Sequence, residues 1–245
     1  MKQLYENYSK EDLAVWSILF NRQADNLKNK ACSDYLKAVN DMEEVLNAAK
    51  LPNFDEINNW FLDKTGWQIE CVPGLIPVNQ FFELLAEKKF PSSTWLRSMQ
   101  KLDYLEEPDM FHDVFGHVPL LSNIEYSDFI HQFGKLGVSF ISNEEKLLQL
   151  QRLYWFTIEF GLIKQQDEFK IYGAGILSSF GESISSLTSN EIDRDSFDLM
   201  TILGTEFCTS EMQTNYFFID SLETLKNSIN TLTKKWELNE LEYSR

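Results

Sequence analysis

Basic side chains are scarce in this chain. Lysine and arginine together number 22 against 38 aspartates and glutamates, which gives a formal net charge of −16 at pH 7 and a sequence pI of about 4.6. DNA, RNA and anionic lipid surfaces repel a polyanion of this size, because binding to them depends on clustered positive charge. We therefore expect neither a nucleic-acid partner nor a membrane partner.

Cysteine is also sparse, and long apolar runs are missing. The three cysteines, Cys32, Cys71 and Cys208, lie far apart and form no Cys-x-x-Cys pair, so a disulfide framework is not indicated. No apolar run approaches the roughly 20 residues that a membrane-spanning helix needs. The polar start, Met1 to Glu6, lacks the apolar core of a signal peptide. The simplest expectation is a cytoplasmic protein in a reducing compartment.

Apolar residues, in contrast, are sufficient for a sizeable core, at 43% of 245 residues. They recur mostly at helical spacing. This spacing predicts helices over 10–27, 33–49, 53–66, 77–85, 125–141 and 144–163, and a last helix from Asp220 to Trp236. Ser9 and Asn53 are the expected N-caps, and Pro77 is the expected first residue of its helix. Short strands are expected over 67–71, 169–172 and 216–219. No repeat or linker interrupts the chain, so we predict one domain over residues 1–245, mainly α with a few short β strands.

Two of the only three histidines lie five residues apart in one apolar stretch, residues 108–121. His112 and His117 are accompanied there by two acids, Asp109 and Asp113. Neutral imidazole is the commonest protein metal ligand near neutral pH. The pair is therefore a candidate metal site, and a pair of hydrogen-bonded core histidines is the alternative.

The spacing of these histidines departs from the common zinc hydrolase motif. That motif, His-Glu-x-x-His, sets its two histidines at i and i+4, whereas Gly116 stands four residues after His112. Residues at i and i+5 lie about 140° apart around an ideal α-helix. His112 and His117 can bind one ion only if the ion is reached from two sides, or if the helix is irregular near Gly116 and Pro119.

A third candidate ligand is Glu159, the only carboxylate in the apolar run 154–163. A buried carboxylate needs a partner, because burying an unpaired charge is costly. A divalent cation is one such partner, and an arginine such as Arg152, or protonation, is the alternative. With His112 and His117, Glu159 would form a two-histidine, one-carboxylate face, which suits non-haem iron(II).

Three blocks of the chain resemble the pterin-dependent aromatic amino acid hydroxylases: residues 108–121, 154–162 and 172–182. The resemblance extends from about Tyr8 into the 220s, and it is closest to the bacterial members that hydroxylate phenylalanine. It implies the catalytic fold of that family and an iron(II)- and tetrahydropterin-dependent monooxygenase that converts L-phenylalanine to L-tyrosine with O2. Tryptophan or tyrosine as the substrate, a zinc hydrolase with the same ligands, and a non-enzymatic sensor are the alternatives.

The resemblance also implies a role for individual residues. His112, His117 and Glu159 match the family's iron ligands. The amino acid pocket is implied to comprise Arg97, Asp109, Pro108, Trp155, Gly175 and Ser178. In this pocket the arginine binds the substrate carboxylate, Asp109 orients the arginine and the Ser178 hydroxyl holds the first histidine. The pterin is implied to contact Phe81, the backbone of Gly74, Leu75 and Ile76, and the side chains of Asp113 and Tyr154. From the residues alone, Arg97 is equally a surface arginine.

Several features depart from the animal members of the family. Those enzymes have threonine where this chain has Leu105, and histidine where it has Pro91. The protein is also expected to lack their N-terminal regulatory domain and their C-terminal tetramerisation helix. We therefore expect a monomer without allosteric activation by its substrate.

Overall fold

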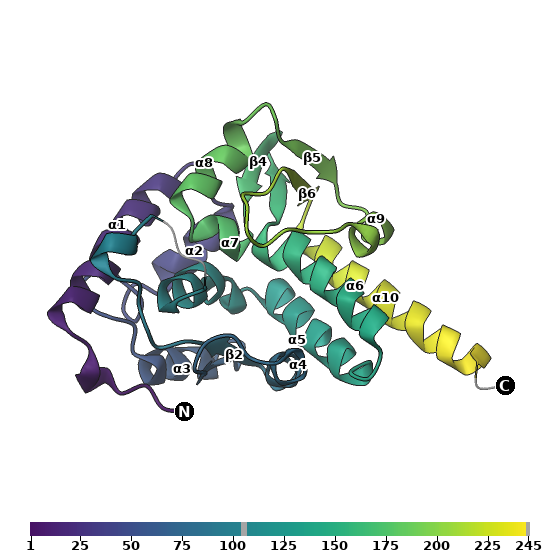
Figure 1. Ribbon diagram of the computed structural model, residues 1–245, viewed down its shortest axis with the longest axis horizontal. Helices are drawn as coiled ribbons and strands as arrows, with labels where there is room; N and C mark the ends of the chain where they lie inside the picture. The colour runs from purple at the N-terminus through teal and green to yellow at the C-terminus, as the bar shows by residue number, and fades with distance from the viewer. Residues whose placement is uncertain (104–106, 244–245) are drawn as a thin grey trace.

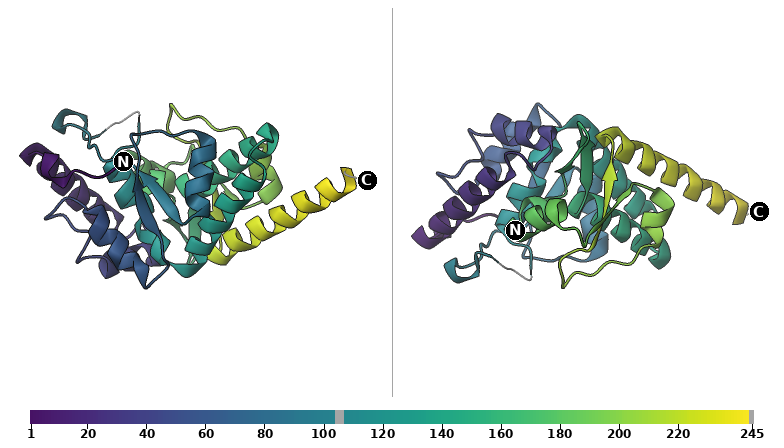
Figure 2. Two further views of the ribbon diagram at one scale, coloured as in Figure 1. Left: turned by 90° about the horizontal axis from the view of Figure 1, so that it is seen from below. Right: turned by 90° about the horizontal axis from the view of Figure 1, so that it is seen from above.

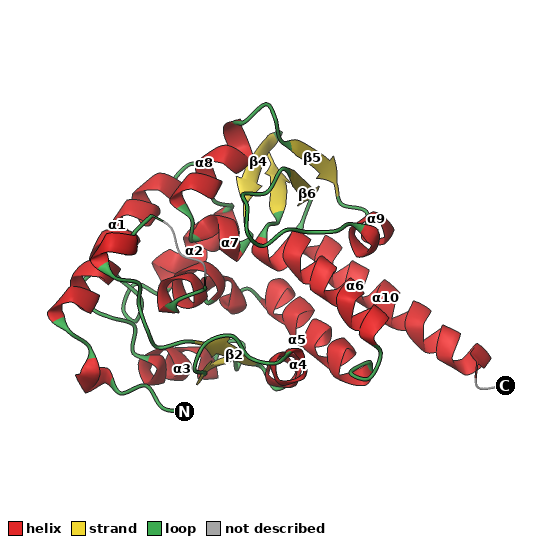
Figure 3. Cartoon of the chain, in the orientation of Figure 1, coloured by secondary structure: helices red, strands yellow, loops and turns green. Residues whose placement is uncertain are grey.

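Helices make up most of this fold, and the strands β4, β5 and β6 lie together at one edge of it (Figure 1, Figure 3). The computed structural model describes residues 1–103 and 107–243, with side chains up to residue 238. The helices are α1 (Lys10–Leu27), α2 (Ser33–Asp41), α3 (Phe54–Leu62), α4 (Val78–Ala86), α5 (Ile124–Ser139), α6 (Glu144–Tyr154), α7 (Ala174–Leu177), α8 (Phe180–Thr188), α9 (Leu199–Gly204) and α10 (Leu222–Tyr243). The predicted fold class, mainly α with a few short strands, is confirmed.

Six short strands form two sheets. A parallel pair joins β1 (Gln68–Cys71) to β2 (Lys89–Ser92). The second sheet has the order β4-β3-β6-β5, with strands at Leu162–Gln165 (β3), Glu168–Ile171 (β4), Asp193–Ser196 (β5) and Asn215–Ile219 (β6). Its β3–β4 pair is antiparallel and its other two pairs are parallel. The second sheet therefore brings residues near 163, 195 and 217 side by side.

Helix starts follow the predicted capping chemistry closely. Ser9 caps α1 in a capping box with Asp12, and the Asn53 side chain accepts from two backbone N–H groups of α3. Both N-caps are confirmed. Pro77 is the N-cap of α4 rather than its first residue, so that prediction was wrong by one position.

Several predicted helices end earlier than expected, and two of them end eight residues or more too early. The helix expected over 33–49 ends at Asp41. The one expected over 144–163 ends as an α-helix at Tyr154, and its last residues become strand β3, in which Leu162 pairs with Phe218 of β6. A short apolar run cannot distinguish a buried helix from a buried strand, and the neighbouring strand decides between them. Strands β2 and β5 and helices α7, α8 and α9 were not predicted.

Helix α10 packs against α5 through a buried face. Its Trp236 ring meets Phe140 edge-on, with ring centroids 5.1 Å apart. The last turns of α10 extend away from the body of the molecule in both views of Figure 2. No helix within residues 1–103 and 107–243 combines the length and the apolarity needed to cross a membrane.

The histidine-bearing segment is held in the aromatic core. Phe111 and Phe115 stack at 4.8 Å, and Trp16 of α1 packs edge-on against Phe111. The buried Tyr35 hydroxyl donates to the carbonyl of Phe115 at 2.7 Å. These contacts join α1 and α2 to the segment, so the site is built on the core and not on a surface loop.

Helices α4 and α5 approach each other at Gly134. A Cβ atom there would lie 2.5 Å from the backbone nitrogen of Ala86 and 2.6 Å from the backbone carbon of Leu85. Gly134→Ala is expected to lower the free energy of unfolding by about 1–3 kcal/mol, because the helices must separate to admit the methyl group. Chemical denaturation measures this effect. Gly204→Ala is the control, since no atom lies within 4 Å of its added Cβ; an equal loss in both variants would contradict the explanation.

Candidate metal and ligand site

The two candidate histidine ligands lie in a π-helical segment, Phe111–His117. Hydrogen bonds of a π-helix join residues five apart, so residues i and i+5 come nearly to the same side. The Nε2 atoms of His112 and His117 are accordingly 3.2 Å apart. Of the two arrangements that the sequence left open, the irregular helix is the one observed.

Glu159 reaches the same point from a second π-helical segment, Trp155–Glu159, which continues α6. Its Oε1 atom lies 3.1 Å from Nε2 of His117, and its Oε2 atom lies 3.6 Å from Nε2 of His112. The candidate ligand atoms of the three residues all lie within 4.8 Å of one another. Arg152, the alternative partner for Glu159, instead donates to the carbonyl of Leu203.

These separations fit one shared cation. Ligands bonded at about 2.1 Å to adjacent corners of an octahedron lie about 3 Å apart. The nearest distances among His112, His117 and Glu159 are 3.1 to 3.6 Å. Two nitrogens and one carboxylate on a single face would leave the opposite positions of the ion open to other ligands.

The protonation states also fit a cation. Burial, opposed by the nearby Glu159, lowers the pKa of His112 to about 4, so its imidazole is neutral at pH 7. Burial alone would raise the pKa of Glu159, but the two imidazoles hold it below its usual range, so the carboxylate is ionised. Neutral imidazole and ionised carboxylate are the forms that bind a metal.

Ser178 determines which nitrogen of His112 carries the proton. Its Oγ atom lies 2.9 Å from Nδ1 of His112 and 2.8 Å from the carbonyl oxygen of Ala174. The carbonyl can only accept, so the single hydroxyl proton of Ser178 goes to Ala174, and Oγ accepts from the Nδ1–H group. The Nε2 lone pair of His112 is therefore left facing His117 and Glu159.

We expect Ser178→Ala to weaken divalent metal binding about 10- to 100-fold, because the imidazole of His112 loses the partner that fixes its tautomer. Competition against a chromophoric chelator measures the change. Ser139→Ala is a matched control, since the Ser139 hydroxyl also donates to the carbonyl four residues earlier but touches no histidine. Equal metal affinity in Ser178→Ala and the parent would contradict this role.

Arg97 is buried with only 9% of its surface exposed, so it is not a surface arginine. Its Nε and Nη2 atoms donate to the two carboxylate oxygens of Asp109, each at 2.9 Å. Asp109 is fully buried and also accepts from the backbone N–H of Arg97 and of His112. Burial alone would raise the pKa of Asp109, but Arg97 lowers it below its usual value.

This pairing leaves one edge of the Arg97 guanidinium available. A guanidinium has five N–H groups in a planar fork, and Asp109 takes the Nε–Nη2 edge. The Nη1 atom makes a long contact, 3.4 Å, with the carbonyl of Leu102. The Nη1–Nη2 edge can therefore still receive a second carboxylate bidentately.

A cavity of about 550 Å³ connects these groups. Of the six residues expected to bind the amino acid, five line it: Arg97, Pro108, Trp155, Gly175 and Ser178. Asp109 does not line it but lies behind Arg97. His112 and Glu159 also line the cavity, whereas His117 lies deeper, at 3% exposure. The cavity thus places the candidate metal ligands next to a buried arginine.

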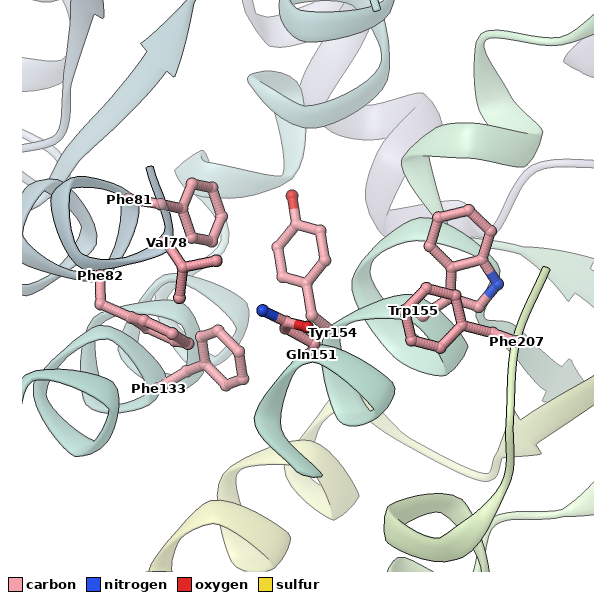
Figure 4. A pocket seen from close by; sticks show the side chains of 8 residues that line it. All are labelled: Val78, Phe81, Phe82, Phe133, Gln151, Tyr154, Trp155 and Phe207. Carbon is pink, nitrogen blue, oxygen red and sulfur yellow. The ribbon is translucent and has the colours of Figure 1, made fainter. Parts of the chain in front are cut away.

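The residues expected on the pterin side are more dispersed. Phe81 and Tyr154 meet edge-on at 5.2 Å and line a smaller apolar cavity of about 160 Å³ (Figure 4). Leu75 borders the larger cavity instead, and Gly74 and Ile76 are its neighbours in the loop before α4. Asp113 accepts from the backbone N–H of Ser93 at 2.8 Å, and burial raises its pKa to about 7. Burial and the neighbouring Glu159 raise the pKa of Tyr154 well above its usual value.

One wall of the larger cavity was not predicted from the sequence. Glu182 and residues 209–213 line it from the side of α8 and of the loop before β6. This loop carries no motif, so only its packing identifies it. The two departures from the animal enzymes fall elsewhere: Pro91 is buried in β2, and Leu105 lies outside the described residues.

The sequence matches the family model of the biopterin-dependent aromatic amino acid hydroxylases over residues 4–243. The chain belongs to this family. Among its curated members, the phenylalanine-4-hydroxylase of Chromobacterium violaceum is 45% identical over 92% of this chain and 75% of its own length. The phenylalanine-4-hydroxylase of Ralstonia nicotianae is 42% identical over 92% of this chain and 71% of its own length.

Solved structures of biopterin-dependent hydroxylases share the fold as well. Phenylalanine hydroxylase from C. violaceum with bound iron(III) and the oxidised cofactor 7,8-dihydrobiopterin superposes with a TM-score of 0.88. The two chains are 45% identical, and the match covers 92% of this chain and 81% of the other. A second structure of that enzyme, bound to cobalt, gives a TM-score of 0.90 at 44% identity, over 94% of this chain and 82% of that one.

Proposed function

We propose that this hydroxylase is an iron(II)- and tetrahydropterin-dependent monooxygenase that converts L-phenylalanine to L-tyrosine with O2. One observation carries the proposal: two imidazole nitrogens and a carboxylate converge within 4.8 Å at the border of a cavity that also exposes one edge of a buried arginine. The names and bound groups of the relatives support the same reaction.

In this proposal His112, His117 and Glu159 hold the iron on one face, and Ser178 keeps the His112 lone pair directed at it. Iron(II) and tetrahydropterin, when bound, supply the oxygen chemistry that no side chain can perform. The open edge of Arg97 takes the substrate carboxylate, and Asp109 holds the guanidinium in place. The substrate ring is then directed toward the metal ligands, between Pro108, Trp155 and Gly175.

The pterin is proposed to lie beside Phe81, whose ring borders the smaller cavity. Phe81 offers an apolar face for stacking. Tyr154 packs edge-on against Phe81 and lies close enough to Glu159 for that carboxylate to raise its pKa. The backbone of Gly74, Leu75 and Ile76 is proposed to hydrogen-bond the edge of the pterin, with Asp113 on the cofactor side. We further propose that residues 1–245 form one catalytic domain that acts as a cytoplasmic monomer. A single apolar core that includes side chains of both α1 and α10 supports the one-domain proposal.

The deciding experiment incubates iron-loaded protein with a tetrahydropterin, O2 and each aromatic amino acid in turn. Mass spectrometry identifies the products, and L-tyrosine from L-phenylalanine is expected as the main product. A parallel incubation with the zinc-loaded protein is the control. If tryptophan is the preferred substrate, the assignment within the family changes. If neither the iron-loaded nor the zinc-loaded protein hydroxylates any of the three amino acids, the proposal is refuted.

A further inference from the structure

Trp155 separates the two cavities described above. It lines both the apolar cavity beside Phe81 and the larger cavity that contains Arg97 and the metal ligands. The loop 205–214, which joins α9 to β6, contacts this indole at two points. Phe207 lies nearly parallel to it, with ring centroids 4.7 Å apart and an interplanar angle of 21° (Figure 4). Gln213 accepts a hydrogen bond from its Nε1–H group at 2.9 Å.

The amide of Gln213 can adopt only one orientation. Indole nitrogen only donates, so the Oε1 atom of Gln213 must face Trp155. The Nε2 group of Gln213 then donates to the carbonyls of Cys208 and Glu211, at 2.9 and 3.0 Å. Every N–H group of the amide has a partner, and the residue is only 8% exposed. Gln213 therefore closes its own loop and at the same time binds the indole.

A buried carboxylate anchors Gln213 from behind. Glu182 of α8 is 5% exposed, and its Oε1 atom accepts from the backbone N–H of Gln213 at 3.1 Å and from the hydroxyl of Tyr216 at 2.5 Å. Tyr216 is fully buried in β6. The backbone of Gln213 is thus tied through Glu182 to both a helix and the sheet.

Stacking and hydrogen bonding restrain different motions of the indole. The stacked ring of Phe207, with its centroid 4.7 Å from that of Trp155, holds the plane of the indole, and Phe160 packs against it at 4.6 Å with a tilt of 39°. Stacked rings can still slide and turn within that plane, because dispersion contacts have little directionality. A hydrogen bond to Nε1 removes this freedom, because it weakens steeply away from linearity.

We propose that Gln213 is a positioning residue that fixes the in-plane orientation of Trp155, and thereby the wall of the cavity that receives the amino acid. This inference rests on the proposed function for the identity of the ligand, L-phenylalanine. Gln213 itself needs no contact with the reacting atoms, since it acts through the indole. Loss of its amide is expected to weaken substrate binding more than it slows turnover.

The first test observes the indole directly. The chain has six tryptophans, so a ¹H–¹⁵N spectrum of the full chain with diamagnetic zinc in place of iron should contain six indole cross-peaks. Trp155→Phe identifies the peak of Trp155. Gln213→Leu should shift that peak upfield and accelerate its hydrogen exchange about tenfold or more, as expected for a lost hydrogen bond. Gln149→Leu is the control: Gln149 of α6 is half-buried and its side chain donates to Glu145, so the substitution should leave the peak unchanged.

The second test is a double-mutant cycle on the iron-loaded enzyme. Gln213→Leu is expected to raise the KM for L-phenylalanine about tenfold, with kcat changed less than about threefold. In the Trp155→Phe background, where no indole N–H remains, the same substitution should change KM less than about twofold. If Gln213 only stabilised its loop, through the carbonyls of Cys208 and Glu211, the substitution would raise KM equally in both backgrounds.

The two tests separate this inference from the proposed function. An unshifted Trp155 peak in Gln213→Leu, or equal KM effects in the two backgrounds, would overturn the positioning role even if the enzyme hydroxylates phenylalanine. If the parent chain does not hydroxylate phenylalanine at all, the proposed function fails. The peak shift then still decides whether Gln213 holds the indole. Where Gln213→Leu folds poorly, Gln213→Met, which is closer in shape, replaces it.

Discussion

Glu159→Gln is expected to lose nearly all hydroxylation, together with its bound iron. The substitution replaces the only charged ligand of the three with a neutral amide, although its shape is nearly unchanged. Losing a group that merely supports a ligand already costs about 10- to 100-fold in metal affinity, so losing the ligand charge should cost more than about a hundredfold. The loss of metal is measured as the iron content after anaerobic loading and gel filtration. The loss of activity is measured as the rate of tyrosine formation.

Thermal unfolding supplies the control for Glu159→Gln. A metal that binds only the folded protein raises its melting temperature, so added iron(II) should stabilise the parent and not the variant. Glu168→Gln, at the exposed first residue of strand β4, is the matched substitution and should behave as the parent. Full iron occupancy in Glu159→Gln would show that the metal lies elsewhere.

Arg97→Ala should both destabilise the fold and weaken substrate binding. Asp109 is fully buried, and without the guanidinium it becomes an uncompensated charge, which costs about 3–5 kcal/mol in the free energy of unfolding. The substrate carboxylate also loses a bidentate partner, so the KM for L-phenylalanine should rise by about a hundredfold. Urea denaturation and steady-state kinetics measure these effects separately.

Two further variants separate folding from binding at this position. Arg97→Lys keeps the charge but lacks the fork, so it should retain much of the stability and little of the affinity. Arg97→Met combined with Asp109→Asn removes both charges and should recover part of the stability, because a neutral pair is buried at less cost. Its KM should nevertheless stay high. A normal KM in Arg97→Lys or in the double variant would contradict the assignment of Arg97 to the substrate carboxylate.

The sequence alone predicted more about the chemistry of the site than about its geometry. The scarcity of histidine drew attention to His112 and His117, and the isolated carboxylate in an aromatic run indicated Glu159. Their spacing left two arrangements open, and it left Arg152 as a possible partner for the carboxylate. The first question concerns the backbone between His112 and His117, whose π-helical form an ideal helical period does not describe. The second was decided by a contact that local patterns do not encode, because Glu159 meets histidines more than 40 residues earlier in the chain.

The starts of the helices and the fold class could be predicted from the sequence because their causes are local. A serine or asparagine N-cap bonds backbone groups two or three residues away, and apolar spacing reports a helix face directly. The end of α6 was not readable, since the change from helix to β3 depends on pairing with β6. The wall formed by loop 205–214 was hidden for the same reason: Gln213 acquires its role only by meeting Trp155, 58 positions away.

The amino-acid sequence by itself thus determined that this is a mainly helical, acidic member of a hydroxylase family, with three candidate ligands for one ion. Only the tertiary structure decided that both ligand segments are π-helical and that their donor atoms meet. A π-helix is intrinsically unfavourable and persists where surrounding packing holds it. Here the aromatic core around Phe111 and Phe115 packs against the first of these segments.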